Sequence, residues 1–521
     1  MRQAHTRLAP AAVALLASLA LGCPVGPGYH RPDVAASPSY RPVSAVADSM
    51  RPVIDSLAAS RDSLAHAPGA GDTIAPPPPG EISGVRTGDS RSFDLRIADS
   101  AATITWFEML QDSVLRSLVL SAIQDNRDVR TAVATIEEYR ADVGIARAPL
   151  FPQITVTGQG GREKLSFGSF TLPANELYTV LGNVSWELDF WGRIRRSTQA
   201  ARSDLLAQEE SHRAVVLDLV SSVVTSYIQL RELDLALAIS RRTLASRQQT
   251  LKLASDRFSR GLISELDVRQ FEADVAEPAA RVSDFERQIV QQENALRVLT
   301  GQPPGPIPRG LPLSDILTRV TVPIGVPADL LTRRPDVRRA EAQLRAATAR
   351  VGSATAARLP TISFTGQYGY EGTLGSEIFR PQTNVYQILG GISIPIFLGG
   401  QLYNAERAAS ARRDQARYQY EQAVLNANRE VDDALAGVRA DRDQVTADET
   451  QVNALRRALQ LASDRYTSGI SSYLDLLDAE RSLFTAELTL VQVEAQELGD
   501  VVNLYRALGG GWLTTPPAEG H

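Results

Sequence analysis

The sequence is poor in the residue types that staple small proteins, bind metals or carry out catalysis. Its 521 residues include one cysteine and five histidines. A single cysteine cannot form an internal disulfide. The histidines are scattered along the chain, so we predict no metal site, no cofactor and no enzyme activity. The formal net charge of −6 indicates no basic surface of the kind that binds nucleic acid.

The apolar run at the N-terminus is too short to span a membrane as a permanent helix. Residues 1–22 instead have the basic start, apolar middle and small-residue end of a secretory signal peptide. Cys23 follows directly. We interpret this as a bacterial lipoprotein box in which Cys23 becomes the lipidated first residue; a cysteine near a cleavage site by coincidence is the alternative. Pro24 is not the aspartate that retains lipoproteins in the inner membrane, which favours the outer membrane.

The next segment lacks the apolar and aromatic residues of a folded domain. Residues 31–92 are rich in proline, serine, alanine, arginine and aspartate, with four prolines in a row at 76–79. Such a composition cannot bury enough apolar surface to offset the entropy lost on ordering. We predict a lipid-anchored tether over 23–105, semi-rigid at the proline run.

What the chain does contain is an internal duplication. It repeats itself at a constant offset of 208 residues over about 140 positions. Asp-Val-Arg at 128–130 recurs at 336–338, and Leu-Ala-Ser-Asp-Arg at 253–257 recurs at 461–465. Repetition in register indicates two copies of one structural unit. The predicted order is a first repeat, an equatorial linker, a second repeat and a C-terminal tail, over 106–308, 309–335, 336–513 and 514–521.

Each copy begins with an Ala-rich helix, expected over about 112–147 and 336–357, and continues with two alternating segments. Over 153–159 and 178–190 of the first copy, and over 362–370 and 386–396 of the second, most apolar side chains occupy even positions and most polar ones odd positions. Alternation is a strand signal. Apolar residues on one side and polar on the other are typical of an outer-membrane barrel; a soluble sandwich with one solvated face is the alternative. Four strands cannot close a barrel, so several chains would pool eight, twelve or sixteen.

Long helices are predicted for the rest of each copy. Apolar residues recur every seven positions from Val216 to Phe258 and from Val424 to Tyr466, which indicates coiled-coil packing. A helix over about 193–258 would be ~100 Å long at about 1.5 Å per residue.

Each long helix is expected to end in a tight turn. Gly261 and Gly469 stand where a helix C-cap is needed. Each copy therefore ends in a helical hairpin, with its tip at 259–264 or 467–472.

The returning helices have their own start signals. The patterns Ser264-x-x-Asp267 and Ser472-x-x-Asp475 predict a capping box at the start of each returning helix. Pro278 should kink the first of these helices.

Four stretches resemble one known family. They are 23–32, 106–126, 185–193 (Ser-Trp-Glu-Leu-Asp-Phe-Trp-Gly-Arg) and 508–512 (Leu-Gly-Gly-Gly-Trp). In order, they resemble the segment after the lipidation site, the first helical segment, the second strand with its helix entry, and the C-terminal signature. The family is the TolC/OprM-like outer-membrane factors, the NodT-type channels of tripartite efflux pumps.

The resemblance implies a mixed α and β membrane protein. It implies a homotrimer whose 12-stranded outer-membrane β-barrel, four strands per chain, continues into a long periplasmic α-helical barrel. Its expected partners are outer-membrane lipid, a periplasmic adaptor protein and an inner-membrane transporter of the resistance-nodulation-division (RND) class. Drugs or other small molecules would leave passively through a duct that is closed at rest. The exit duct of a type I protein secretion system is the second interpretation, and a trimeric coiled-coil surface protein is the third.

The two copies differ at the second tip in a way that predicts a gate. Asp478 corresponds to Gln270, so the second copy has an extra carboxylate one turn after Asp475, on the same helix face. In the implied three-fold assembly, these carboxylates form two stacked rings that attract cations. They match the paired aspartates of the family's periplasmic entrance. Tyr466 and Asp267 match the tyrosine–aspartate link that holds neighbouring hairpins shut.

The resemblance also assigns the hairpin tips to adaptor contact. The residues concerned are Arg260, Gly261, Ser264, Ser468, Gly469 and Ser472. Ser471 stands where some relatives have an arginine, so no second gate link is carried over there.

Overall fold

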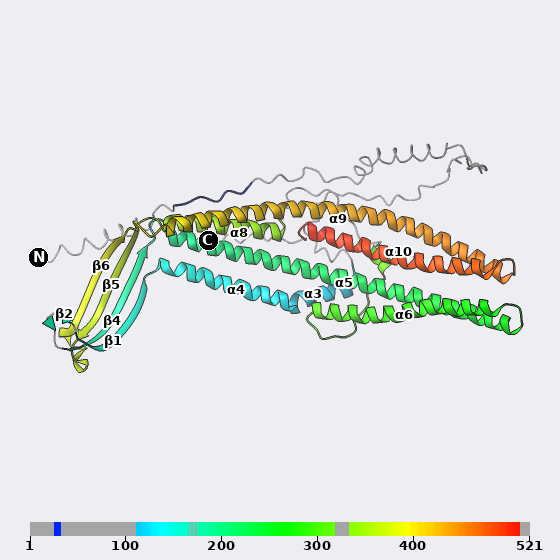
Figure 1. Cartoon of the computed structure of the whole chain (residues 1–521), viewed down its shortest axis with the longest axis horizontal. Helices are drawn as coiled ribbons and strands as arrows, with labels where there is room; N and C mark the ends of the chain where they lie inside the picture. Colours follow the sequence, from blue (N-terminus) through cyan, green and yellow to red (C-terminus); the bar gives the residue numbers. More distant parts are fainter. Residues whose placement is uncertain are drawn as a thin grey trace, which may run out of the picture. The chain divides into compact units, whose positions relative to one another are not determined.

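The structure, a computed structural model, describes residues 25–32, 111–164, 166–167, 170–171, 174–317 and 333–510 (Figure 1). Cys23 and most of the predicted tether lie outside these residues. The chain divides into two compact units, and each unit draws on both sequence repeats. Unit 1 takes Thr131–Arg213 and Pro335–Val424 with the N-terminal segment, and unit 2 takes Ala214–Arg334 and Leu425–His521 with Ala35–Arg130.

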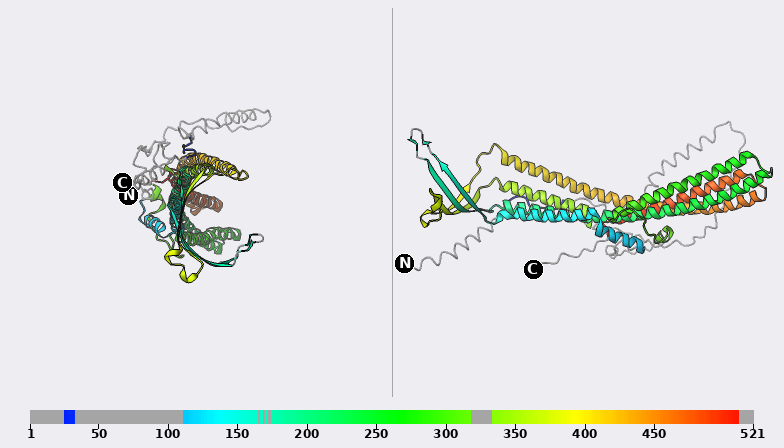
Figure 2. Two further views of the ribbon diagram at one scale, coloured as in Figure 1. Left: turned by 90° about the vertical axis from the view of Figure 1, so that its left-hand side faces the viewer. Right: turned by 90° about the horizontal axis from the view of Figure 1, so that it is seen from below.

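Unit 1 contains a four-stranded antiparallel sheet with the order β1-β4-β5-β6. The strands are β1 (Gln153–Glu163), β4 (Asn175–Leu188), β5 (Thr361–Gly372) and β6 (Asn384–Ser393), with a small hairpin of β2 (Ser166–Phe167) and β3 (Phe170–Thr171) between β1 and β4. Figure 2 shows the four long strands side by side in one curved sheet. The β4–β5 pairing joins the two repeats, and it leaves β1 and β6 as edge strands.

The register of the sheet gathers apolar residues on one face. Ile154 pairs with Val184, and Ile362 pairs with Ile392. Because alternate residues of a strand point to the same face, these even-numbered residues lie together. Ile154 is 73 % exposed and Ile392 is 70 % exposed. An exposed apolar band on a sheet is the surface that an outer-membrane barrel presents to lipid.

The helices of unit 1 are most of α4 (Arg127–Arg147), α8 (Pro335–Ala356) and the first parts of the long helices α5 (Arg193–Ser259) and α9 (Gln401–Thr467). Short 3₁₀ turns complete the described elements of this unit: η2 (Ala148–Leu150), η4 (Gly375–Glu377) and η5 (Pro381–Thr383). Hydrogen bonds join the segments where strands and helices meet. Trp191 Nε1, just before α5, donates to Pro360 O, just before β5, at 2.8 Å, and Ser353 Oγ of α8 donates to Arg193 O at the start of α5 at 3.1 Å. The sheet and its helices are therefore joined by specific contacts as well as by the chain.

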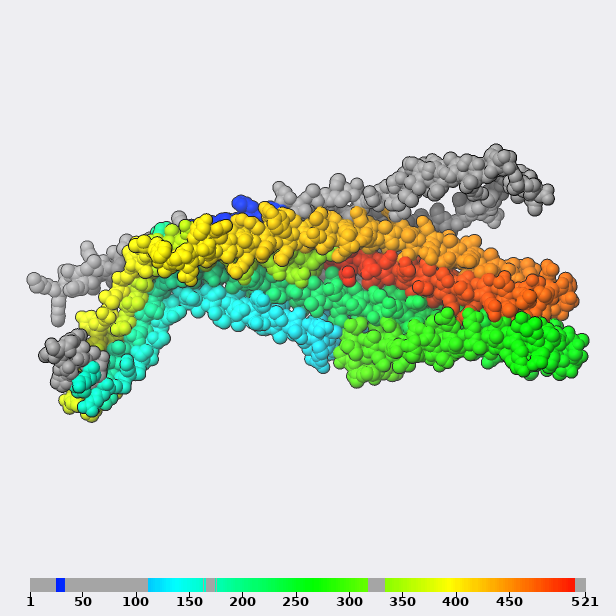
Figure 3. Space-filling view, viewed as in Figure 1, coloured from blue at the N-terminus to red at the C-terminus, as the bar shows by residue number. Residues whose placement is uncertain are grey.

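Unit 2 is helical. It contains α3 (Ser113–Asp125), the later parts of α5 and α9, α6 (Glu265–Leu299), α7 (Leu313–Leu317) and α10 (Tyr473–Ala507). The pairs α5–α6 and α9–α10 form two hairpins, which are green and yellow-orange to red in the space-filling view of Figure 3. Their core includes Val223, Tyr227 and Leu230 from α5, Leu296 from α6 and Leu498 from α10.

The duplication predicted from the sequence is confirmed element by element. Adding 208 to the bounds of α5 and α6 gives the bounds of α9 and α10, and the paired helices have equal lengths of 67 and 35 residues. Among the described helices, α5 alone is long and apolar enough to cross a membrane by length and composition. Its apolar window is 56 % buried within the protein, as in a core helix.

The helix expected over 112–147 is two helices. Asn126 adopts an extended conformation (φ −62°, ψ 136°) between α3 and α4. Its Oδ1 accepts hydrogen bonds from the backbone N–H groups of Asp128 at 2.8 Å and Val129 at 3.3 Å. The side chain therefore caps α4 and stabilises the break, which helix periodicity does not reveal.

One of the two predicted capping boxes is wrong. Ser264 and Asp267 form theirs in both directions, but Ser472 makes no side-chain cap hydrogen bond and Asp475 is exposed. The difference follows from the first residue of α10. The ring of Tyr473 packs on Phe271 of α6 at 3.6 Å between centroids, and this contact, rather than a local cap, fixes the start of α10.

Candidate gate at the hairpin tips

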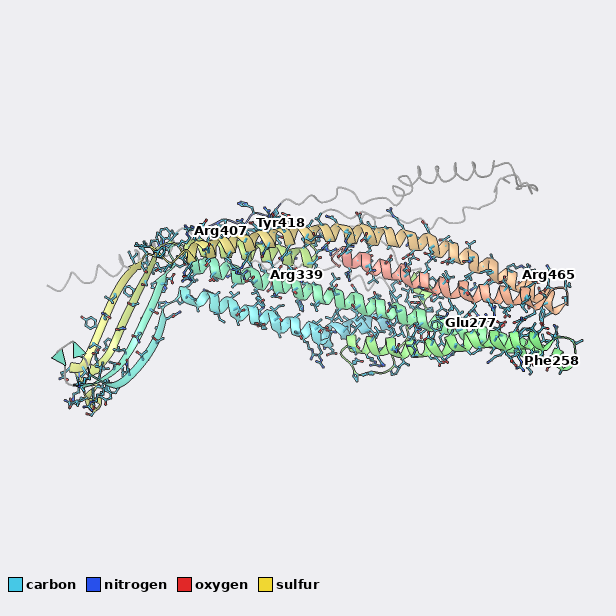
Figure 4. The ribbon with its side chains drawn as sticks, in the orientation of Figure 1. Phe258, Glu277, Arg339, Arg407, Tyr418 and Arg465 are labelled. Atoms are coloured by element: carbon cyan, nitrogen blue, oxygen red, sulfur yellow. The ribbon has the colours of Figure 1, made fainter. Side chains whose placement is uncertain are left out.

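Both tips in unit 2 use the same turn. Gly261 and Gly469 have φ angles of +71° and +73°, a conformation that side chains disfavour. The following N–H groups, those of Leu262 and Ile470, donate to carbonyls five residues earlier at 3.0 and 2.9 Å. This is the Schellman pattern that ends a helix at a glycine. Figure 4 labels Phe258 and Arg465, which lie near the ends of α5 and α9 at these turns.

The predicted tip residues are exposed. All six side chains or backbones assigned to adaptor contact lie at the surface: Arg260, Gly261, Ser264, Ser468, Gly469 and Ser472. The carboxylates of Asp475 and Asp478 are exposed as well. Asp475 lies in the first turn of α10, where the helix dipole favours a carboxylate, whereas Asp478 lies one turn further on and has no such local role.

Tyr466 and Asp267, the predicted latch, have different partners within one chain. Tyr466 is 8 % exposed in a cluster with Ala254, Phe271 and Tyr473. Its ring lies 5.0 Å from the guanidinium of Arg257. Asp267 instead accepts hydrogen bonds from Ser264, and among the described residues no hydrogen bond joins it to Tyr466.

The structure adds a buried link between the hairpins that sequence reasoning missed. The carboxylate of Asp274 on α6 is 2 % exposed. It accepts short hydrogen bonds from the Tyr473 hydroxyl and the Arg481 guanidinium, both on α10. We call Asp274, Tyr473 and Arg481 the clasp. Because hydrogen bonds to a buried carboxylate are among the stronger ones in proteins, the clasp holds α6 to α10 just behind the tips.

Arg247 of α5 joins this network by binding the backbone carbonyl of Asp274. Pro278 lies inside α6 and has no N–H to donate to the carbonyl of Asp274, four residues earlier. The guanidinium of Arg247 donates to that carbonyl instead, at 2.8 Å. Pro278 is therefore accommodated in a continuous helix, and a buried arginine satisfies the carbonyl that the proline leaves unpaired.

The charged side chains nearest to Arg247 are two glutamates. Its Nη1 donates to Glu277 at 3.1 Å, and its Nε lies 3.9 Å from Glu480 on α10. Burial raises the pKa of Glu480, which the nearby Arg247 opposes. The guanidinium also lies 5.6 Å from the ring centroid of Phe484. One cation thus contacts α6 and α10 together.

A second buried carboxylate, further along α10, binds two arginines. Glu487 is 5 % exposed and binds Arg242 of α5 and Arg456 of α9. These residues line a groove of about 520 Å³ between the helices. Buried carboxylates on both sides, Asp274 of α6 and Glu487 of α10, are therefore points at which the first hairpin is fastened to the second.

The clasp residues and Arg247 differ from their counterparts in the other copy. At an offset of 208, Asp274 corresponds to Ser482, Tyr473 to Glu265 and Arg481 to Ala273, while Arg247 corresponds to Leu455. Every member of the network stands where the copies differ, as do most positions of these helices, so the difference alone does not single out the clasp. The same comparison had pointed to Asp478.

Comparison with known proteins identifies the family of this chain. The sequence profile described as "Outer membrane efflux protein" matches residues 118–302 and 326–510, two segments that are themselves 208 apart. The chain belongs to this family. The efflux protein is 33 % identical over 434 residues to the "Probable efflux pump outer membrane protein TtgC" of Pseudomonas putida, covering 79 % of this chain and 86 % of that protein. It is also 33 % identical over 416 residues to the "Cation efflux system protein CusC" of Escherichia coli, covering 80 % and 90 %.

A solved structure agrees with the fold of the efflux protein. The Neisseria gonorrhoeae MtrE outer membrane channel, in its open state, matches with a TM-score of 0.75 at 28 % identity, over 94 % of this chain and 98 % of that one. The predicted TolC-like fold, with two repeats, four strands and long helices per chain, is confirmed. The efflux protein is an outer-membrane channel and not an enzyme.

Proposed function

We propose that this channel is the exit duct of an RND-type tripartite pump, through which small molecules leave passively, and that it is gated at the hairpin tips. The observation that carries the proposal is the exposed carboxylate pair Asp475 and Asp478 at the tip of the second hairpin. The relatives named for efflux pumps and cation efflux favour a pump over a protein secretion duct. The adaptor and the inner-membrane transporter are the partners that this role requires.

The channel is proposed to be a homotrimer. One chain supplies four strands and leaves the backbone of β1 and β6 unpaired at the edges of the sheet. Unpaired backbone groups cannot face lipid, so three copies closing a 12-stranded barrel would satisfy both edges. Mass photometry in detergent should give three chains, and a stable folded monomer would contradict the barrel.

The N-terminus is proposed to be anchored by a lipid on Cys23. Cys23 lies outside the described residues, but the segment after it is held in unit 1. Val25 N donates to Trp191 O at 3.0 Å, between β4 and α5. Tyr29 Oη donates to Glu341 at 3.0 Å, and Arg31 Nε donates to the Tyr420 hydroxyl at 3.0 Å. Mass spectrometry of the mature protein should show a diacylglyceryl group on Cys23; a mature N-terminus beyond residue 23 would exclude the anchor.

The carboxylate rings make the gate testable. In a trimer, Asp475 and Asp478 give six carboxylates at the narrow end, and such rings attract cations and exclude anions. The double variant Asp475→Ala/Asp478→Ala should shift the reversal potential in a KCl gradient towards zero and weaken block by multivalent cations. Asp478→Gln, which restores the residue of the first copy, should have an intermediate effect. Unchanged selectivity in the double variant would refute the ring assignment.

Adaptor contact is proposed for the exposed turns. A photo-activated crosslinker on Ser468→Cys should capture the adaptor in the native envelope, whereas the same crosslinker on Thr446→Cys, an exposed position well back along α9, should not. Equal capture from both positions would contradict docking at the tips.

A further inference from the structure

The second hairpin carries paired acids where the first carries an ion pair. Glu449 of α9 and Glu494 of α10 are the counterparts, 208 residues on, of Arg241 and Glu286. Arg241 donates to Glu286 at 2.7 Å. In the second hairpin, burial, together with the charges of Glu449 and Glu497, raises the pKa of Glu494 to about 7. The duplication thus provides an internal reference for an unusual electrostatic arrangement.

A closer pair of acids lies further along the same two helices. Asp441 of α9 and Asp500 of α10 are the counterparts of Leu233 and Gln292 in the first hairpin. There, Gln292 Nε2 donates to the carbonyl of Ser226 at 2.8 Å. A leucine and an amide pack together at any pH, whereas two carboxyl groups in contact depend on a proton.

The Asp441 side chain is buried and one of its oxygens has no donor. The residue is 4 % exposed. Its Oδ1 accepts a hydrogen bond from Gln496 Nε2 at 3.0 Å, while its Oδ2 is buried without a hydrogen-bond partner. The carboxyl of Asp500 lies near enough for the two charges to interact, and its Oδ2 lies against Gly437, one helical turn before Asp441. Two carboxyl oxygens can share a hydrogen bond only if one of them carries a proton.

The backbone of α9 is shaped for this contact. A Cβ at Gly437 would lie 2.0 Å from Asp500 Oδ2, so any other residue there would displace the carboxyl. The counterpart of Gly437 in the first copy is Gln229. Glycine inside a helix lowers its stability by about 0.5–1 kcal/mol relative to alanine, which indicates that the room it provides has a use.

We propose that Asp441 and Asp500 form a proton-binding site in which one proton bridges the two carboxyl groups and fastens α9 to α10. When the proton leaves, the two carboxylates repel each other and this part of the hairpin loosens. Among the described residues, no group of three acidic, histidine or cysteine side chains is placed to hold a metal ion, so the ligand that the geometry points to is the proton.

The charges around the site determine the direction of the pH dependence. Asp500 and Glu497 face Asp441 from α10; on its own helix, Arg442 is bound to Glu497 at 3.2 Å. Burial, and then the charge of Asp500, raises the pKa of Asp441 to about 6, above the value of about 3.9 for an unfolded aspartate. Between these values the folded hairpin binds more protons than the unfolded chain. The contribution of this site to the stability of the hairpin therefore falls as the pH rises from about 4 to about 6 and is level above that.

Hydrogen exchange of the whole protein in detergent tests the proposal. Exchange followed by mass spectrometry at pH 5.0 and 7.5, corrected for the intrinsic pH dependence of amide exchange, would compare residues 434–449 and 494–504 with residues 226–241 and 286–296 of the first hairpin. The second hairpin should lose about tenfold in protection between the two pH values, since one unit of pKa corresponds to about a factor of ten. Burial also raises the pKa of Glu232 and of Glu494, one in each compared hairpin, to about 7, so the comparison is made in a Glu232→Gln/Glu494→Gln background. In that background the first hairpin should change little, and equal behaviour of the two hairpins would overturn the proposal.

Two variants locate the effect. Asp441→Asn keeps the shape of the side chain and removes its charge, so protection at pH 7.5 should approach that of the wild type at pH 5.0. Asp443→Asn, an exposed acid on the same helix, changes the net charge equally and should keep the wild-type pH dependence. Full pH dependence in Asp441→Asn would overturn the assignment. Hydrogen exchange measures the opening of the hairpins and not ion conduction, so either result is independent of the proposed gate.

Discussion

Replacing Arg247 by methionine should loosen α6 at one identifiable place. Methionine fills a similar volume but cannot donate to the carbonyl of Asp274, which Pro278 leaves without its helical partner. The carbonyl would then be buried and unpaired. The expected result is faster local opening of α6 around Asp274, with the tip turn and the distant strands unchanged.

The size of the effect follows from the contacts of Arg247. An unpaired buried carbonyl costs about 1–3 kcal/mol. The ion pair with the half-exposed Glu277 contributes under ~1 kcal/mol. Against these, methionine removes two buried guanidinium nitrogens, Nε and Nη2, that have no hydrogen-bond partner. The net loss of local stability should be about 2 kcal/mol.

A double-mutant cycle with Pro278→Ala isolates the carbonyl. Alanine supplies the missing N–H, so the Asp274 carbonyl regains an ordinary helical hydrogen bond. Pro278→Ala should therefore recover about 1–2 kcal/mol in the Arg247→Met background and much less in the wild type. Hydrogen exchange of peptides over 268–285 measures both. If the two substitutions are additive within about 0.5 kcal/mol, the reasoning about Pro278 and Arg247 is refuted.

Four further substitutions have definite expected outcomes. Tyr473→Phe removes one donor from the buried Asp274 carboxylate and should raise opening at the clasp by about 1.5–3 kcal/mol; hydrogen exchange on α10 that stays at the wild-type rate would show that the hydroxyl contributes nothing. Gly469→Ala should destabilise the second tip by about 1 kcal/mol because Gly469 has a positive φ. Gly499 lies inside α10 with open space around it, so Gly499→Ala should stabilise the protein by about 0.5–1 kcal/mol. Thermal melts that shift in the same direction for both variants would contradict this. Tyr466→Phe should raise the resting conductance in planar bilayers if its hydroxyl holds neighbouring hairpins shut in the assembled channel, and an unchanged conductance would remove it from the latch.

The elements that depend on local pattern were predictable. The glycines at 261 and 469, the seven-residue apolar period and the 208-residue offset together gave the long helices and both tips to within a residue or two. Alternation gave the four strands for the same reason, since the side-chain period of a strand is a local property. The open alternative, a soluble sandwich, is excluded by the family to which the chain belongs.

The features that depend on long-range partners were not predictable from pattern. Asn126 ends a helix because its amide also donates to Leu299 O at 3.0 Å, a contact from a distant segment. Ser472 does not cap because Tyr473 packs on Phe271 of another helix. The clasp joins residues about 200 positions apart along the chain. A mismatch between the two copies does not by itself mark such a site, because the paired helices differ at most positions.

The most direct test of the account is single-channel recording of the purified protein in planar bilayers. A gated duct with carboxylate rings at its narrow end should give small, cation-selective current steps in the wild type. The clasp variant Asp274→Ala should give larger steps, because the carboxylate that binds Tyr473 and Arg481 is gone. A folded protein that produces no current steps in either form would contradict the central claim that the chain is a channel closed at its hairpin tips.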